Sequence, residues 1–247
     1  GPHLSRAYAG GGQNPGGGRG QIRELVGRGW FRRIFYVPTD VKLPRANGTS
    51  FHTWPLGISV QHLLGREDAL VRAVVGAHEN FGAKRGVLAA WGALALLVTH
   101  PNKTAVDAGD RTHRKWDGEE EASLSALARR RPDLLEHRMI APAEYYAELA
   151  KYRFLAAPRG QAIQSSKYFE ALLLMTIPIV RGPWQCFYDL KSYGLPIVIV
   201  ESWDEITEAN LERWWAELSP RLAEARWLLT VEGIESLLYG KCWRGRS

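Results

Sequence analysis

The residues that could bind a phosphate gather in residues 151–183, KYRFLAAPRGQAIQSSKYFEALLLMTIPIVRGP. This segment has the pattern of a strand, a glycine-containing loop, a helix and a second strand. Ser165 has the residue type and place of a helix N-cap, which puts Arg159 and Gly160 in the loop just before the helix. Backbone N–H groups, the positive end of the helix dipole, the Arg159 guanidinium and the Lys167 ammonium would then meet at one point. This combination suits a diphosphate.

Glu170 is the only charged residue between Phe169 and Val180, and five apolar residues follow it directly. A carboxylate in such surroundings needs a partner. It could accept hydrogen bonds from ribose hydroxyls, pair with Lys167 or Arg159, or face solvent. Periodicity alone favours the last two of these interpretations.

A second basic group follows the apolar run at 94–100 and contains Arg111, His113 and Arg114. If the apolar run is a strand, these residues lie near its carboxyl end and can form a second phosphate-facing cluster. The alternative is that they pair with the acidic residues 119–121, which would contribute little at a surface.

The elements around these segments alternate between strand-like and helix-like patterns. Strands are expected near 94–100, 138–141, 153–158, 177–180 and 195–202, and helices near 118–130, 143–152, 165–175, 207–218 and 220–238. Short apolar strands between helices predict an α/β, Rossmann-like parallel sheet with helices on both faces. A ligand is then expected beyond the carboxyl ends of the strands. Four residues of the 207–218 helix are expected in the core: Leu211, Trp214, Trp215 and Leu218.

The first 90 residues are less regular. Residues 1–21 are rich in glycine and are expected to form a flexible tail. A strand at 31–37 and a helix at 67–81 are expected within an N-terminal portion, residues 22–90. Residues 91–247 then form the domain with the parallel sheet.

Composition narrows the chemistry. The chain has 247 residues, a formal net charge of +6 and a pI near 9.4, which favours an anionic partner. Cys186 and Cys242 are too few for a disulfide scaffold and have no zinc-ligand spacing. There is no Asp-X-Asp triplet, so we expect neither a bound metal nor a resident cofactor. No zinc-finger, RNA-recognition or helix-turn-helix pattern supports nucleic-acid binding.

The pattern KYRF-x-x-x-PRG, then S-x-K-x-x-E-A-L, IPIV, LPIVIV and WDEIT, resembles the C-terminal part of exostosin-like glycosyltransferases. The resemblance covers about residues 92–238, and several ordered elements match together. A weaker likeness exists to the α1,3-fucosyltransferases. The exostosin-like resemblance implies a two-domain GT-B fold, in which the C-terminal domain holds the nucleotide sugar and the N-terminal portion of this chain is reduced or truncated.

The resemblance also implies site residues. Glu170 would contact the ribose of the donor, and the donor phosphates would lie among Arg159, Gly160, Ser165 and Ser166. Residues 161–164 lack the acidic residue that relatives often have in this loop, which leaves the donor undetermined. The base that activates the acceptor would come from the N-terminal portion, where His52, His62 and Asp40 are candidates by residue type only.

The function that the resemblance implies is transfer of a sugar from a nucleotide diphosphate, with a UDP-sugar favoured, to a hydroxyl of a glycan or glycoprotein. The alternatives are a catalytically silent module that binds nucleotide sugar or acidic glycan, and a GDP-fucose-type fucosyltransferase. Gly1 and Pro2 have the form of a protease-cleavage remnant, so an upstream membrane anchor could have been removed. With acceptor triplets at Asn47 and Asn102, the expected location is then the Golgi lumen.

Overall fold

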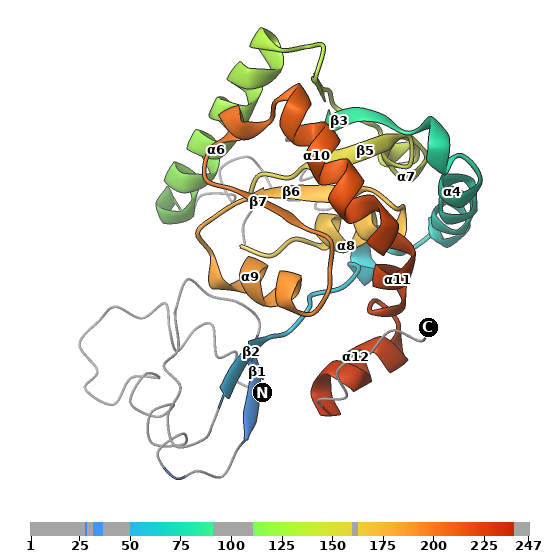
Figure 1. Ribbon diagram of the computed structural model, residues 1–247, viewed down its shortest axis with the longest axis vertical. Helices are drawn as coiled ribbons and strands as arrows, with labels where there is room; N and C mark the ends of the chain where they lie inside the picture. The colour runs from blue at the N-terminus through green and yellow to red at the C-terminus, as the bar shows by residue number, and fades with distance from the viewer. Residues whose placement is uncertain (1–27, 29–31, 37–49, 91–110, 160–162, 240–247) are drawn as a thin grey trace.

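The computed structural model describes Arg28 and residues 32–36, 50–90, 111–159 and 163–239. Its centre is a five-stranded sheet in the order β4-β3-β5-β6-β7, with every neighbouring pair parallel (Figure 1). The strands are β3 Arg85–Ala89, β4 Leu135–His137, β5 Tyr152–Ala156, β6 Ile177–Arg181 and β7 Val198–Val200. The predicted parallel sheet is therefore confirmed, but β4 lies at Leu135–His137 and not at the expected 138–141.

The first strand differs from the prediction. β3 begins at Arg85, ahead of the sheet domain expected from residue 91, and the expected strand at 94–100 lies outside the described residues. The predicted division at residue 91 puts β3 in the N-terminal portion, whereas β3 pairs with both β4 and β5. Part of the N-terminal 90 residues thus belongs to the same sheet as the segment at 151–183.

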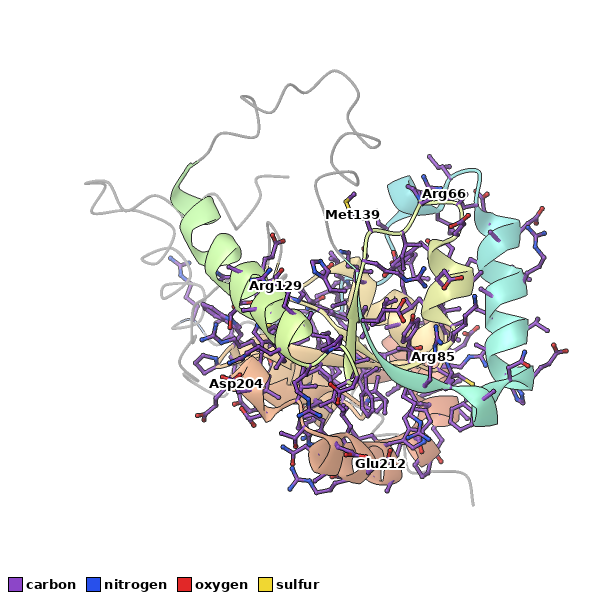
Figure 2. All side chains as sticks on the ribbon, turned by 90° about the horizontal axis from the view of Figure 1, so that it is seen from above. Arg66, Arg85, Arg129, Met139, Asp204 and Glu212 are labelled. Atoms are coloured by element: carbon purple, nitrogen blue, oxygen red, sulfur yellow. The ribbon has the colours of Figure 1, made fainter. Side chains whose placement is uncertain are left out.

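Helices connect and cover the strands. They are α4 Glu67–Glu79, α6 Arg111–Arg130, α7 Tyr145–Leu149, α8 Ser166–Leu173, α9 Gln185–Ser192, α10 Glu208–Leu218, α11 Leu222–Trp227 and α12 Val231–Tyr239. Figure 2 shows α6, which carries Arg129, on one side of the sheet and α4 on the other. Both faces of the sheet are covered by helices, as expected for apolar strands that have no solvent-exposed face.

The strand order creates a switch point. In chain order the strands lie 2-1-3-4-5, because the chain adds β4 on one side of β3 and then β5 on the other. The connections after β3 and β5 therefore leave the sheet in opposite directions. Beyond the carboxyl ends of these two strands is the place where open α/β sheets bind ligands.

The apolar stripe of α10 packs on the sheet as predicted. Leu211, Trp214 and Leu218 are buried, and Trp215 is partly buried against Phe154 of β5 at 5.8 Å between ring centroids. Figure 1 shows α10 crossing the sheet.

The predicted single helix at 220–238 is instead two helices, α11 and α12, that meet at a tight contact. A Cβ at Gly233 would lie 2.1 Å from the carbonyl oxygen of Trp227, so only glycine permits this approach.

Lys84 joins the elements at the opposite, amino-terminal edge of the sheet. Its ammonium lies 2.5–3.3 Å from the carbonyl oxygens of Ala150, Tyr152 and Leu174 and from Oγ1 of Thr176. Burial lowers the pKa of Lys84 to about 7. The three carbonyls favour the charged form, so the lysine holds β3, β5 and the end of α8 together through charge-assisted hydrogen bonds.

Two short strands precede this unit, β1 Arg33–Tyr36 and β2 Ser50–Thr53, and they form a separate parallel pair (Figure 1). Thr53 attaches this pair to α9, because its amide and hydroxyl both donate to Oδ2 of Asp189. The chain continues through α3 Val60–Leu63 into α4. Among the described residues, no helix has the length and apolar character needed to cross a membrane.

Candidate functional site

The helix N-cap predicted at Ser165 is confirmed. Ser165 has extended backbone angles, φ −127° and ψ 145°, and its side chain accepts a hydrogen bond from the amide of Lys167 at 3.4 Å. α8 therefore begins at Ser166, beyond the carboxyl end of β5. Because α8 returns across the sheet to β6, the positive end of its dipole lies at the switch point.

Lys167 bridges the two strands that flank the switch point. Its ammonium donates to the carbonyl oxygen of Ala90, the first residue after β3, at 3.1 Å, while its own backbone lies in the first turn of α8. Burial lowers the pKa of Lys167, and the charges of Glu170 and Glu121 oppose this effect. The structure thus places a cation beside Glu170, as the sequence suggested.

Glu170 is buried, with 2% of its surface exposed, so the solvent-facing interpretation is wrong. Its Oε1 atom has no hydrogen-bond partner among the described residues. Burial raises the pKa of Glu170 to about 7, against the opposing effects of Lys167, of a hydrogen bond with the Ser166 side chain and of Arg66. A buried polar atom without a partner costs free energy, and such atoms in native proteins call for a specific explanation.

Three further residues around Glu170 were not predicted. The hydroxyl of Tyr145 is buried and, like Oε1 of Glu170, has no hydrogen-bond partner among the described residues. Burial and the Glu170 charge raise the pKa of Tyr145 well above its usual value, and the same two causes raise the pKa of Tyr146 to about 12. Arg66, at the start of α4, acts on both Glu170 and Tyr146 through its charge.

Arg159 is held by two contacts that the sequence did not reveal. Its backbone amide donates to Oε2 of Glu120, a carboxylate that is only 8% exposed, at 3.1 Å. Its guanidinium lies over the ring of Trp184, 4.8 Å from the centroid. Glu120 was expected near the start of its helix, but α6 already begins at Arg111, so Glu120 lies well inside it. The loop before α8 is therefore anchored on α6 and on Trp184.

The other predicted residues are placed only in part. Arg111 and Arg114 lie in the first turn of α6 and His62 lies in α3, but their side chains are outside the described part of the chain, as are Gly160 and Asp40 entirely. Ser166 is buried and hydrogen-bonds Glu170, the residue expected to contact ribose.

His52 belongs to the two-stranded sheet. Its Nε2 atom lies 2.7 Å from Oγ of Ser50, and its ring stacks on Phe35 at 5.2 Å. The described residues therefore bring Arg159, Ser165, Ser166, Lys167 and Glu170 to the switch point. Of the three candidate bases, His52 has a described side chain, and it lies in the two-stranded sheet.

No family model matches the chain, and no curated protein matches it. The geometry alone defines what the cluster can do. It combines the N-terminus of α8 and two cationic side chains, which suit an anion, with a buried carboxylate and a buried phenol that each need a hydrogen-bonding group. No group of three or more His, Cys, Asp or Glu side chains is placed to hold a metal ion within the parts of the chain that the structure describes.

Proposed function

We propose that the chain binds a nucleotide diphosphate sugar at the N-terminus of α8 and transfers the sugar to a hydroxyl of a glycan or glycoprotein. The observation that carries this proposal is Oε1 of Glu170, a buried carboxylate oxygen without a partner among the described residues, at the switch point of a doubly wound sheet. Ribose hydroxyls are hydrogen-bond donors of the kind that this atom lacks.

The phosphates fit the other half of the cluster. The capped N-terminus of α8 offers its dipole, and Lys167 and Arg159 supply positive charge within the same loop and first turn. A nucleotide has an anionic group and a hydroxyl-bearing group on adjacent parts of one molecule, so it matches both halves of the cluster. This charge supply also supports metal-independent binding, because Lys167, Arg159 and the N-terminus of α8 can offset the charge of the phosphates.

The finer assignment rests on the resemblance to exostosin-like glycosyltransferases. It supports a GT-B architecture with the α/β unit as the donor-binding half, a UDP-sugar as the first donor to test, and the Golgi lumen as the location. Under this proposal the residues before β3 supply part of the acceptor side, and the base that activates the acceptor hydroxyl comes from His52, His62 or Asp40.

The test is a calorimetric titration with UDP, GDP, CMP and the corresponding nucleotide sugars, on the wild type and on Glu170→Gln. The substitution keeps the shape of the side chain but removes charge-assisted hydrogen bonds, which are worth about 1.5–3 kcal/mol. Donor affinity should therefore fall by about one to two decades. The matched control is Glu212→Gln on α10, an exposed carboxylate paired with Arg153, which should leave the affinity unchanged (Figure 2). A wild type that binds no nucleotide would end the proposal.

A catalytically silent binding module is the second candidate. The observation that favours it is the position of His52, which is engaged with Ser50 and Phe35 on the two-stranded sheet. Nucleotide-sugar binding without slow donor hydrolysis, and without transfer to any of a panel of glycan acceptors, would select this candidate. Transfer would select the enzyme.

A further inference from the structure

Two buried polar atoms near the switch point lack partners among the described residues, and they are complementary. Oε1 of Glu170 belongs to α8, and the hydroxyl of Tyr145 belongs to α7, at the first residue of that helix. Burial and, second to it, the charge of Glu170 raise the pKa of the Tyr145 phenol. One atom is an acceptor in its ionised form, and the other is a donor that keeps its proton.

Both atoms lie at the same edge of the sheet. Helices α7 and α8 each precede a strand of a parallel sheet and run antiparallel to it, so their N-termini lie at the carboxyl ends of the strands. Figure 2 shows Arg66, which also acts on Glu170, on the same side of the molecule as Met139, which follows β4. Arg66, which precedes α4, and Tyr145 of α7 therefore both interact electrostatically with the carboxylate of Glu170 on α8.

The chemistry of the two atoms selects the missing group. A hydroxyl can donate to a carboxylate and accept from a phenol through one oxygen. An ammonium only donates hydrogen bonds, and a negatively charged phosphate oxygen would be repelled by the carboxylate of Glu170. Of these three groups, only a hydroxyl satisfies both atoms through one oxygen.

We propose that Tyr145 is a specificity-determining residue that donates a hydrogen bond to the ribose hydroxyl bound by Glu170. The site should then bind a ribonucleotide more tightly than the deoxy analogue that lacks this hydroxyl. This inference rests on the proposed function. We assign the hydroxyl to the ribose because the ribose lies next to the phosphates in a nucleotide. Glu170 likewise lies one helical turn after the N-terminal residues of α8, where the phosphates would bind.

The absence of a described protein partner makes Tyr145→Phe an informative variant. Removing a hydroxyl that has no partner does not break a native hydrogen bond, so the melting temperature should stay the same or rise. The matched control is Tyr168→Phe on α8. The buried hydroxyl of Tyr168 donates to the carbonyl oxygen of Ile163 at 3.1 Å, so its loss should lower the melting temperature.

The binding test uses UDP and GDP with their 2′-deoxy and 3′-deoxy analogues, titrated into the wild type and Tyr145→Phe. For the nucleotide that binds, the wild type should lose about tenfold in affinity with one of the two deoxy analogues. Tyr145→Phe should lose a similar factor with the ribonucleotide and a smaller further factor with that analogue. This non-additive result is the signature of a shared hydroxyl.

The failures are distinguishable. If the wild type binds a ribonucleotide and Tyr145→Phe binds it equally well, the inference about Tyr145 is overturned, while the proposed function stands. A melting temperature lowered as in Tyr168→Phe would show a structural partner for Tyr145 and would also overturn the inference. If no nucleotide binds to the wild type, the proposed function and this inference fail together.

Discussion

Nζ of Lys167 lies 3.1 Å from the carbonyl oxygen of Ala90, so the first turn of α8 is tied to the end of β3. β3 and β5 are the two strands between which the chain reverses its direction of winding. The same lysine therefore links α8 to the end of β3 and supplies a positive charge that acts on Glu170.

Lys167→Met should weaken nucleotide diphosphate binding by about tenfold, a loss of about 1.4 kcal/mol. It should also raise the pKa of Glu170 further, because Lys167 is the strongest influence that opposes burial there. The pH midpoint of nucleotide binding should consequently move upward. Calorimetry across a pH series measures both effects, and the exposed Lys191→Met on α9 serves as the control. An unchanged midpoint in Lys167→Met would argue against the coupling.

The stability of the protein without ligand should depend on the protonation of Glu170. Burial raises its pKa from 4.5 to about 7 in the folded state. The folded state therefore binds the proton more tightly than the unfolded chain, and this contribution to stability is full below pH 4.5 and is lost as the pH rises through about 7. A shift of this size corresponds to about 3 kcal/mol.

Urea unfolding of the wild type and Glu170→Gln from pH 4.5 to 8 tests this dependence. The wild type should lose stability relative to the variant as the pH rises. The groups that act on the carboxyl, which are Lys167, Ser166 and Arg66, are present in both proteins, so the difference isolates Glu170. Parallel curves would contradict the raised pKa.

Lys84→Met should lower the free energy of unfolding by at least about 2 kcal/mol, because buried carbonyl oxygens lose a charged donor. Chemical denaturation measures the loss. Lys151→Met removes a surface ammonium paired with Glu148, so its effect should stay below about 1 kcal/mol. Similar losses in the two variants would mean that the carbonyls around Lys84 find other donors.

Two N-cap substitutions can separate helix stability from ligand binding. Ser165 caps α8 and Thr207 caps α10, each through its side-chain oxygen, and replacement by alanine should cost about 1 kcal/mol at either position. Only Ser165→Ala should also weaken nucleotide binding, because α8, unlike α10, begins at the switch point. Equal nucleotide affinities in the two variants would remove Ser165 from the binding site.

The segment from β5 to β6 was predictable because its signals are local. The apolar strands, the N-cap at Ser165 and the lone charge of Glu170 are all visible within 33 residues of sequence. β3 was missed because it overlaps the start of a long apolar run, residues 87–98. Within such a run, the periodicity of apolar residues does not indicate which part forms the strand.

The remainder of the cluster was hidden by distance along the chain. Glu120, Tyr145 and Arg66 come from three other helices or their first turns, and nothing in their own neighbourhoods distinguishes them from surface residues. Their roles appear only when the strand order brings α4, α6 and α7 to the ends of β3 and β5.

The attachment of residues 53–56 has a mechanical consequence. Thr53 is fastened to Asp189 of α9, while the amide of Leu56 and the carbonyl of Trp54 are fastened to the side chain of Gln164, next to the N-cap of α8. A load applied to β2 is therefore carried by the side chains of Asp189, Gln164 and Tyr193, the last of which donates a hydrogen bond to the carbonyl oxygen of Thr53. Because Gln164 directly precedes the N-cap of α8, a force applied to β2 would be transmitted through residues 53–56 to the loop before α8. A tether attached at β2 would therefore detect force at the switch point.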